Sequence, residues 1–174
     1  MIDSGLPKRK RNRLNGYDYS TNGMYFVTIC THNRRNLLCD IIVGEAHEPP
    51  AVVMSDYGII VDNVINNLQQ RFNIEISNYI IMPNHIHLLI SIDDFRFFRA
   101  TRESPLHSKP NISQIVGYLK MNVSKEIHKS NPDLTVWQRS FHDHIIRDDE
   151  DCKKIYNYIE SNPSKWTEDC FYIE

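Results

Sequence analysis

The chain has 174 residues, a formal net charge of −2 and 41% hydrophobic residues. These values suit one compact domain with a buried core, and they exclude a low-complexity disordered chain. No apolar run approaches the roughly 20 residues that span a bilayer, and the N-terminus is charged where a signal peptide is apolar. We therefore expect a cytoplasmic protein with no membrane association.

The cysteine pattern agrees with this location. Cys30, Cys39, Cys152 and Cys170 form no CxxC pair. Their spacing also lacks the regularity of a small disulfide-rich domain. Free thiols in a reducing compartment are therefore expected.

Charge is distributed unevenly along the chain. Residues 1–39 hold seven basic and two acidic residues, whereas the remainder holds thirteen basic and twenty acidic ones. The densest basic cluster comprises Lys8, Arg9, Lys10, Arg11 and Arg13. Such a cluster can form an arm that binds DNA phosphates in a salt-dependent way, although a solvated tail has the same composition. We assign residues 1–22 to a basic arm and residues 23–174 to a single domain.

The first half of the domain carries signals for a strand, a helix and a hairpin. Residues 24–31 are rich in β-branched and aromatic residues, which is typical of a strand. Residues 32–50 are interpreted as irregular. Apolar residues at helical spacing predict a helix over 56–71, with Ser55 as its N-cap. Residues 74–93 are predicted to form a β-hairpin that turns at a Pro-Asn pair.

The second half continues with a loop, a helix, a strand and a last helix. Residues 94–110 are polar and contain two prolines, which indicates a loop insertion. A helix is predicted over 112–128, a short strand over 141–147, and a helix from the acidic run 148–151 to about Ser161. The order predicts an α+β, ferredoxin-like split βαβ fold. It has a four-stranded antiparallel sheet, two helices on one face and an additional C-terminal helix.

Two histidines lie close together in the second strand of the predicted hairpin. Side chains alternate between the faces of a strand, so His85 and His87 point the same way. Ile86, Leu88 and Ile90 point to the opposite, apolar face. Two imidazoles on one face can bind a metal ion, although histidines on half-buried strands are commonly structural.

The last predicted helix carries residues that complete a chemical site. Tyr158 and Asn162 are four residues apart and therefore lie on one face of that helix. An amide oxygen can join two imidazoles around a metal ion and leave positions open for phosphate oxygens and water. A tyrosine beside a divalent cation can attack a polarised phosphate. Together these residues indicate phosphoryl-transfer chemistry.

The ordered set of motifs resembles a known family. The motifs are Tyr25–Thr31 after Gly16–Tyr19, His85–His87 after Ile80–Asn84, Trp137–Arg147, and Tyr158–Pro163. This set covers nearly the whole chain and resembles the single-tyrosine HUH transposases. Within them it is most similar to the REP-associated tyrosine transposases.

The resemblance implies a ferredoxin-like nuclease domain. It implies that His85, His87 and Asn162 hold Mg²⁺ or Mn²⁺ and that Tyr158 is the nucleophile. In the family, attack on single-stranded DNA gives a 5′-phosphotyrosine link and a free 3′-hydroxyl, without a nucleotide cofactor. The substrates are imperfect-palindrome hairpins with a single-stranded flank. Some relatives are homodimers with the tyrosine supplied in trans and others act alone, so both arrangements stay open.

Five further residues are candidates for supporting roles. Arg34, Arg35 and Lys120 can contact the DNA backbone, or can simply be solvated. His142 and His144 alternate along a strand and can support the metal site from outside its ligand shell, or can be ordinary sheet residues.

Three functional hypotheses follow from the sequence. The first is an active single-stranded DNA endonuclease and strand transferase. The second is a domesticated DNA-binding protein that recognises repeat hairpins without cleaving them. The third is a metal-dependent hydrolase that uses activated water and no covalent step.

Overall fold

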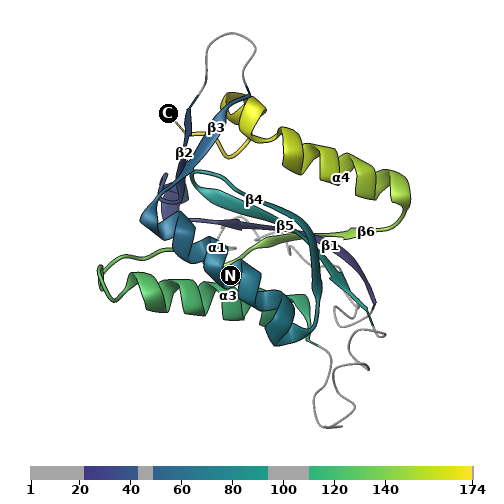
Figure 1. Cartoon of the computed structure of the whole chain (residues 1–174), viewed down its shortest axis with the longest axis horizontal. Helices are drawn as coiled ribbons and strands as arrows, with labels where there is room; N and C mark the ends of the chain where they lie inside the picture. The colour runs from purple at the N-terminus through teal and green to yellow at the C-terminus, as the bar shows by residue number, and fades with distance from the viewer. Residues whose placement is uncertain (1–21, 43–48, 94–109, 174) are drawn as a thin grey trace, which may run out of the picture.

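The computed structural model describes residues 22–42, 49–93 and 110–173. Its centre is a four-stranded antiparallel sheet with the strand order β4-β5-β1-β6 (Figure 1). The strands are β1 (Gly23–Cys30), β4 (Glu75–Ile81), β5 (His85–Ile92) and β6 (His142–Ile146). Omitting the small sheet described below, this is the ferredoxin-like order, so the predicted fold class is confirmed.

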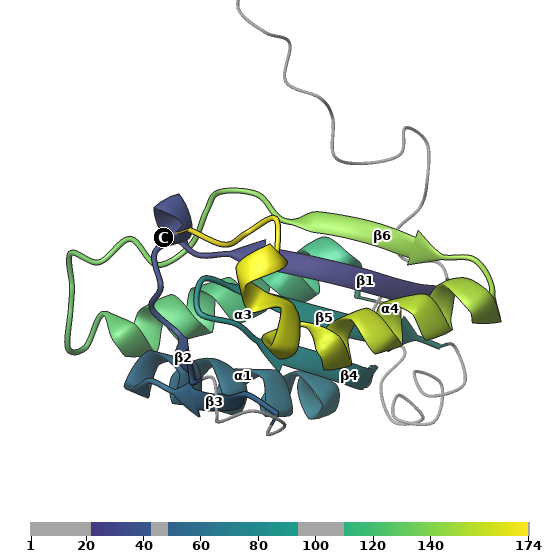
Figure 2. The same cartoon turned by 90° about the horizontal axis from the view of Figure 1, so that it is seen from above.

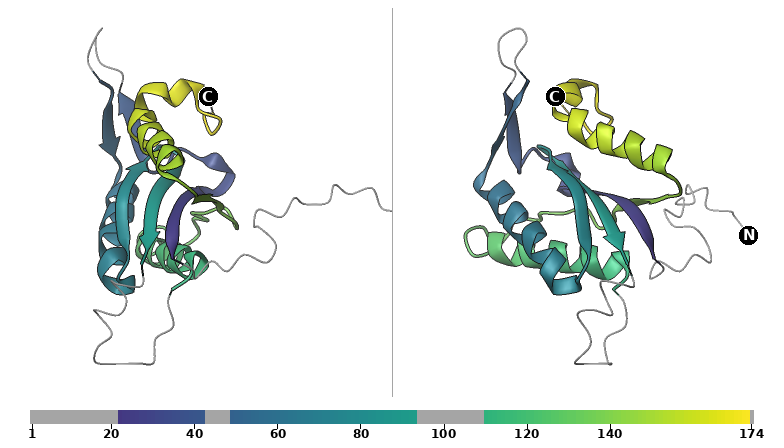
Figure 3. Two further views of the ribbon diagram at one scale, coloured as in Figure 1. Left: turned by 90° about the vertical axis from the view of Figure 1, so that its right-hand side faces the viewer. Right: turned by 45° about the vertical axis from the view of Figure 1, so that its right-hand side comes forward.

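Helices cover both faces of this sheet. Helices α1 (Asp56–Phe72) and α3 (Ile112–Ile127) pack on one face, and α4 (Asp149–Ser161) lies across the other (Figures 1 and 3). The Ser55 hydroxyl accepts a hydrogen bond from the Gly58 amide at 3.1 Å, which confirms the predicted N-cap. Of the α-helices in the described residues, only α4 lies on this face of the sheet, where it can cover a site.

The hydrophobic core lies between the sheet and the helix pair. Alternate residues of β1 and β5 enter this core: Tyr25, Val27, Ile29, Ile86, Leu88, Ile90 and Ile92. They meet the apolar stripe of α3, which comprises Ile112, Ile115, Val116, Leu119, Val123 and Ile127. Because strand side chains alternate, the same register places His85 and His87 on the α4 face. The predicted division of the two faces is confirmed.

A second, two-stranded sheet corrects one prediction. Strands β2 (Cys39–Ile42) and β3 (Ala51–Met54) pair antiparallel beside the main sheet (Figure 2). Strand β2 lies within residues 32–50, for which the sequence predicts irregular structure, and β3 lies in the segment 51–54, for which it predicts no element. Each strand has only four residues, too few for alternation to stand out from the surrounding loop. The Ser55 hydroxyl ties this sheet to α1 because it contacts the carbonyls of Leu37 and Leu38 at 2.6 and 3.0 Å.

Predictions about the cysteines, membrane spans, the basic arm and the 94–110 insertion have separate outcomes. All four cysteines are free thiols, as expected. None of the helices in the described residues is long and apolar enough to cross a membrane. The basic arm and most of the 94–110 insertion lie outside the described residues, so the predictions made for them stay predictions.

Candidate active site

Two buried histidines form the centre of the site. In the register of the sheet, His85 lies opposite Cys30 and His87 opposite Thr28. Both imidazoles are at most 1% exposed. Their ring centroids are 4.5 Å apart, and their Nε2 atoms are 3.0 Å apart. The two imidazoles, which the sequence predicts to share one face of the strand, therefore meet within one chain.

Each imidazole has a polar partner on its other nitrogen. The Asn84 Oδ1 lies 2.9 Å from Nδ1 of His85, and the Thr28 Oγ1 lies 2.8 Å from Nδ1 of His87. An amide oxygen can only accept, so Nδ1 of His85 carries the hydrogen and its Nε2 keeps a free lone pair. Such partners are the usual means of orienting a metal-binding histidine.

Burial keeps both histidines neutral at ordinary pH. It lowers the pKa of His85 to about 4, against a smaller opposing effect of the Asp169 carboxylate. Burial, followed by the neighbouring His85, lowers the pKa of His87 well below its usual value. A neutral imidazole is the form that binds metal ions, so the pair is in the right protonation state for a ligand role.

Tyr158 reaches the histidine pair from α4. Its hydroxyl oxygen lies 3.3 Å from Nε2 of His87 and donates a hydrogen bond to Oδ2 of Asp169 at 3.1 Å. Its ring meets Phe26 edge-on at 6.0 Å, which fixes its direction over the sheet. Tyr158 is 38% exposed, so a substrate can reach it. Burial and then the Asp169 charge raise the pKa of Tyr158 above its usual value.

Asn162 lies at the end of the same helix, under the chain that follows it. The backbone of Asn162 is helical, and the 3₁₀ turn Pro163–Glu168 begins directly after it. Its amide is 2% exposed, and its Nδ2 donates to Oδ2 of Asp169 at 2.8 Å. Its Oδ1 is buried with no hydrogen-bond partner in the described part of the chain. A buried acceptor without a donor is a position that a cation can satisfy.

Asp169 is a site residue that the sequence reasoning missed. Ligand atoms of His85, His87 and Asp169 all lie within 4.8 Å of one another. Nothing in the sequence distinguishes Asp169 from the other acidic residues near the C-terminus, because only the 3₁₀ turn after α4 returns it to the sheet. Asn84 was missed as well, although its place directly before His85 was a usable signal.

These residues fit a divalent cation. Two nitrogens bound at right angles to one cation at about 2.1 Å lie about 3.0 Å apart, and the two Nε2 atoms have this separation. Imidazole nitrogens combined with carboxylate or amide oxygens hold divalent first-row metals with positions left open. The donor set therefore suits Mn²⁺, and Mg²⁺ with additional water ligands.

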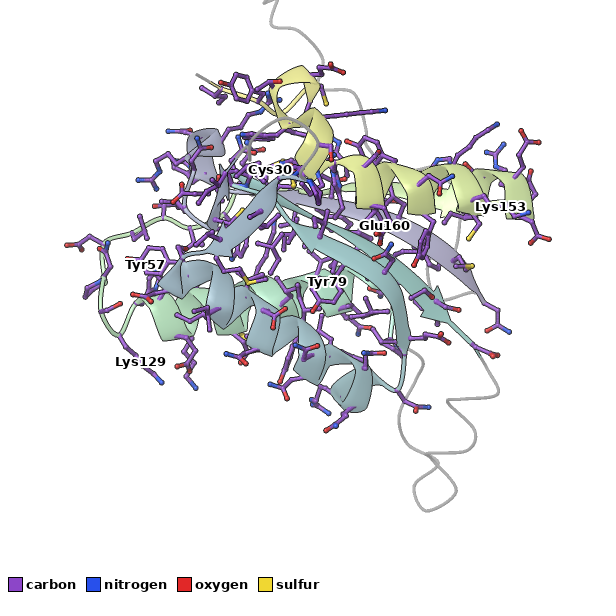
Figure 4. The ribbon with its side chains drawn as sticks, turned by 45° about the horizontal axis from the view of Figure 1, so that its top comes forward. Cys30, Tyr57, Tyr79, Lys129, Lys153 and Glu160 are labelled. Carbon is purple, nitrogen blue, oxygen red and sulfur yellow. The ribbon has the colours of Figure 1, made fainter. Side chains whose placement is uncertain are left out.

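The position of α4 is fixed at both ends by polar contacts with strands. Its N-cap, Asp148, accepts from the Asp151 amide at 2.8 Å, and Asp151 pairs with Nε2 of His144 on β6 at 2.8 Å. Towards its C-terminal end, α4 carries Glu160, which is labelled in Figure 4. Glu160 accepts from Nδ2 of Asn78 on β4 at 2.9 Å. The helix that carries Tyr158 is thus anchored to both edge strands of the sheet.

Lys120 is half-buried between α3 and the loop before β6. Its ammonium group donates to the carbonyls of Gln138 and Ser140, both at 2.8 Å. Burial lowers the pKa of Lys120 to about 8. These bonds join α3 to the loop before β6, and the predicted contact of Lys120 with DNA stays a prediction.

The two arginines after β1 are also held by carbonyl groups. Arg34 donates to the Cys170 carbonyl at 3.0 Å and lies 5.2 Å from the centre of the Phe171 ring. Arg35 donates to the Thr135 carbonyl at 2.7 Å. Arg34 therefore borders the site through the C-terminal segment, whereas Arg35 points to the loop before β6.

The two histidines of β6, His142 and His144, have different neighbours. His142 pairs in register with Thr28, the partner of His87, on the neighbouring strand. His144 is directed to Asp151 at the start of α4. The proposed supporting role of these two residues stays a prediction, as does DNA binding by the arm residues outside the described structure.

Comparisons with known proteins identify the family. The family model described as "Transposase IS200 like" matches residues 19–96, which include both site histidines. An uncharacterised protein of Haemophilus influenzae is 32% identical over 181 residues, covering 99% of this chain and 97% of that protein. This chain belongs to the IS200-like transposase family.

Two further relatives narrow the position within the IS200-like transposases. A Haemophilus influenzae protein provisionally named a REP-associated tyrosine transposase is 23% identical over 158 residues, covering 85% of this chain and 74% of that protein. A solved structure of a REP-associated tyrosine transposase bound to a REP hairpin shares the fold, with a TM-score of 0.55 and 17% identity. The match covers 88% of this chain and 74% of the solved one. The resemblance to REP-associated transposases is thus confirmed.

Proposed function

We propose that this transposase cleaves and rejoins single-stranded DNA beside a hairpin through a 5′-phosphotyrosine at Tyr158. The observation that carries the proposal is the 3.3 Å distance between the Tyr158 hydroxyl and Nε2 of His87 in the same chain. A nucleophile within hydrogen-bond reach of a histidine pair, 38% exposed, has the placement that phosphoryl transfer needs. One chain supplies both parts, which supports action in cis.

The proposed reaction is an in-line exchange of one phosphoester bond for another. The Tyr158 oxygen forms a bond to phosphorus while the bond from phosphorus to the 3′ oxygen breaks, and the departing 3′ oxygen takes a proton from water to become a hydroxyl. Asp169 accepts the hydrogen bond from the Tyr158 hydroxyl at 3.1 Å and is placed to take its proton. Reversal by a 3′-hydroxyl rejoins the strand without a nucleotide cofactor.

The metal ion belongs to the proposal. His85 and His87 would hold Mg²⁺ or Mn²⁺, with the unpartnered Oδ1 of Asn162 as the predicted oxygen ligand. Bound there, a divalent cation would neutralise charge on the phosphate that Tyr158 attacks. Burial disfavours ionisation of Tyr158 most, and the Asp169 charge disfavours it next. The cation would also offset this Asp169 charge.

The DNA partner is proposed from the family and from the solved relative with its REP hairpin. Arm residues Lys8 to Arg13, together with Arg34, Arg35 and Lys120, are the proposed contacts with the DNA backbone. Binding through such phosphate contacts weakens as the salt concentration rises. This salt dependence distinguishes backbone binding from recognition of the hairpin sequence. A homodimer would serve the same chemistry, but one chain already contains the whole histidine and tyrosine set.

The test uses a labelled hairpin oligonucleotide with a single-stranded flank, with Mn²⁺ or Mg²⁺. We expect a covalent protein–DNA adduct on a denaturing gel from the wild type, and its loss in Tyr158→Phe. Tyr156→Phe is the matched control, because Tyr156 lies on the same helix and is 44% exposed. Cleavage that survives in Tyr158→Phe would instead support the water-using hydrolase. Binding without cleavage by the wild type would support the domesticated DNA-binding protein.

A further inference from the structure

Within residues 22–42, 49–93 and 110–173, Asp169 is the acidic side chain that joins the histidine pair. It follows the 3₁₀ turn after α4, and its ligand atoms fall within 4.8 Å of those of His85 and His87. We propose that Asp169 is itself a metal ligand, which gives this transposase a site of two histidines and one carboxylate. The inference rests on the metal-dependent site of the proposed function and adds a ligand from outside the tyrosine helix.

The carboxylate is held towards the site by three donors. Oδ2 accepts from Nδ2 of Asn162 at 2.8 Å and from the Tyr158 hydroxyl at 3.1 Å, and Oδ1 accepts from the Phe171 amide at 2.7 Å. A carboxylate oriented by several hydrogen bonds is typical of ligands that must hold one geometry. Asn162 thus positions Asp169 through Nδ2, and its Oδ1 stays the predicted oxygen ligand of the proposed function.

The segment around Asp169 is attached to the same histidines. Asn84 donates from Nδ2 to the Phe171 carbonyl at 2.8 Å and contacts Nδ1 of His85 through Oδ1 at 2.9 Å. The Phe171 ring lies 4.6 Å from the His85 ring, and Arg34 donates to the Cys170 carbonyl. The Asn84 side chain therefore supports both His85 and the segment that carries Asp169, although these two residues lie far apart in the sequence.

The negative charge of the Asp169 carboxylate contributes to cation affinity in a way that the neutral ligands do not. The two histidines are neutral, so a site of two imidazoles and an amide oxygen carries no negative charge. A carboxylate attracts a divalent cation directly, and hard cations prefer oxygen ligands. Two histidines with one carboxylate are also a recurrent arrangement for divalent first-row metals with open positions. We therefore expect Asp169 to raise Mn²⁺ affinity more than any neighbouring acid.

The experiment measures Mn²⁺ binding without DNA, from the paramagnetic resonance signal of the free ion. Asp169→Asn should raise the Kd at least about tenfold, and Asp169→Glu should restore part of that loss. Glu168→Gln is the matched control, because it removes one negative charge from the adjacent exposed residue and should change the Kd less than about twofold. Circular dichroism checks that each variant is folded.

Two outcomes would overturn the proposal. One is an unchanged Kd for Mn²⁺ in a folded Asp169→Asn protein; if that variant also binds the hairpin more tightly, the carboxylate is a stand-in for a DNA phosphate. The other is an equal loss of affinity in Glu168→Gln, which would indicate general electrostatics. The adduct assay tests the proposed function separately. If Mn²⁺ binding requires Asp169 but the wild type forms no covalent adduct, the proposed strand transfer is refuted and the assignment of Asp169 as a ligand stands.

Discussion

The Thr28 hydroxyl lies 2.8 Å from Nδ1 of His87, and both groups are buried. Because a hydroxyl can donate or accept, this contact is compatible with either neutral tautomer of His87. With the hydrogen on Nε2, His87 donates towards Nε2 of His85, 3.0 Å away. With the hydrogen on Nδ1, both Nε2 lone pairs are free for a metal ion. Thr28 therefore permits the proton shift that metal binding requires.

Thr28→Val should weaken metal binding while keeping the side-chain shape. Valine cannot accept a hydrogen from Nδ1 of His87, so the tautomer that binds metal would bury an unpaired N–H group. We expect Mn²⁺ affinity to fall about 10-fold to 100-fold, measured by paramagnetic resonance. Thr28→Ser keeps the hydroxyl and should stay close to the wild type. Equal affinities in the valine and serine variants would contradict this role.

Lys120→Met should destabilise the fold. The substitution leaves the carbonyls of Gln138 and Ser140 without their shared donor, a loss of about 1–3 kcal/mol in the free energy of unfolding. Urea denaturation measures it. Lys125→Met on the exposed side of the same helix is the control and should change stability by less than about 0.5 kcal/mol. If the two variants are equally stable and only Lys120→Met binds DNA less tightly, then Lys120 acts at the DNA and not in the fold.

Gly58→Ala and Gly117→Ala should have opposite effects although both lie in helices. A Cβ at Gly58 would lie 2.0 Å from the Leu38 carbonyl oxygen, whereas a Cβ at Gly117 has nothing within 4 Å. We expect Gly58→Ala to lower the free energy of unfolding by about 1–3 kcal/mol or more. Gly117→Ala should raise it by up to about 1 kcal/mol. Thermal unfolding compares them, and a tolerated alanine at 58 would refute the close packing of α1 on the segment before β2.

The buried Cys39 thiol should make stability fall in alkali. Burial, followed by the Asp40 charge, raises the pKa of Cys39 from 9.0 to about 12. Between these values the unfolded chain releases the proton and the folded chain keeps it, so the contribution is complete below about pH 9 and is lost as pH rises towards 12.

Urea titrations at pH 8 and pH 10.5 measure this effect. The drop in unfolding free energy between the two pH values should be larger in the wild type than in Cys39→Ala. Other alkaline groups, such as Cys30, are present in both proteins and cancel in the comparison. Equal drops would show that the Cys39 thiol ionises alike in the folded and unfolded chains.

Local patterns were sufficient for most of the main fold. The helices α1 and α3 begin and end within about one residue of the prediction, because apolar periodicity and, for α1, the cap at Ser55 are local signals. The strands β2 and β3 were missed, since four-residue strands take their identity from pairing with each other. Pairing between segments is not written in either segment alone.

The sequence by itself determined that His85 and His87 share a face, and that Tyr158 and Asn162 share another, because alternation and helical spacing are properties of neighbouring residues. Only the tertiary structure decided that these two faces meet. It also decided that Asp169 joins them, through a 3₁₀ turn that returns the chain to the sheet. The contact between His87 and Tyr158, 71 positions apart, depends on the packing of α4, and the approach of Asp169 depends on the turn that follows this helix; no local pattern encodes either.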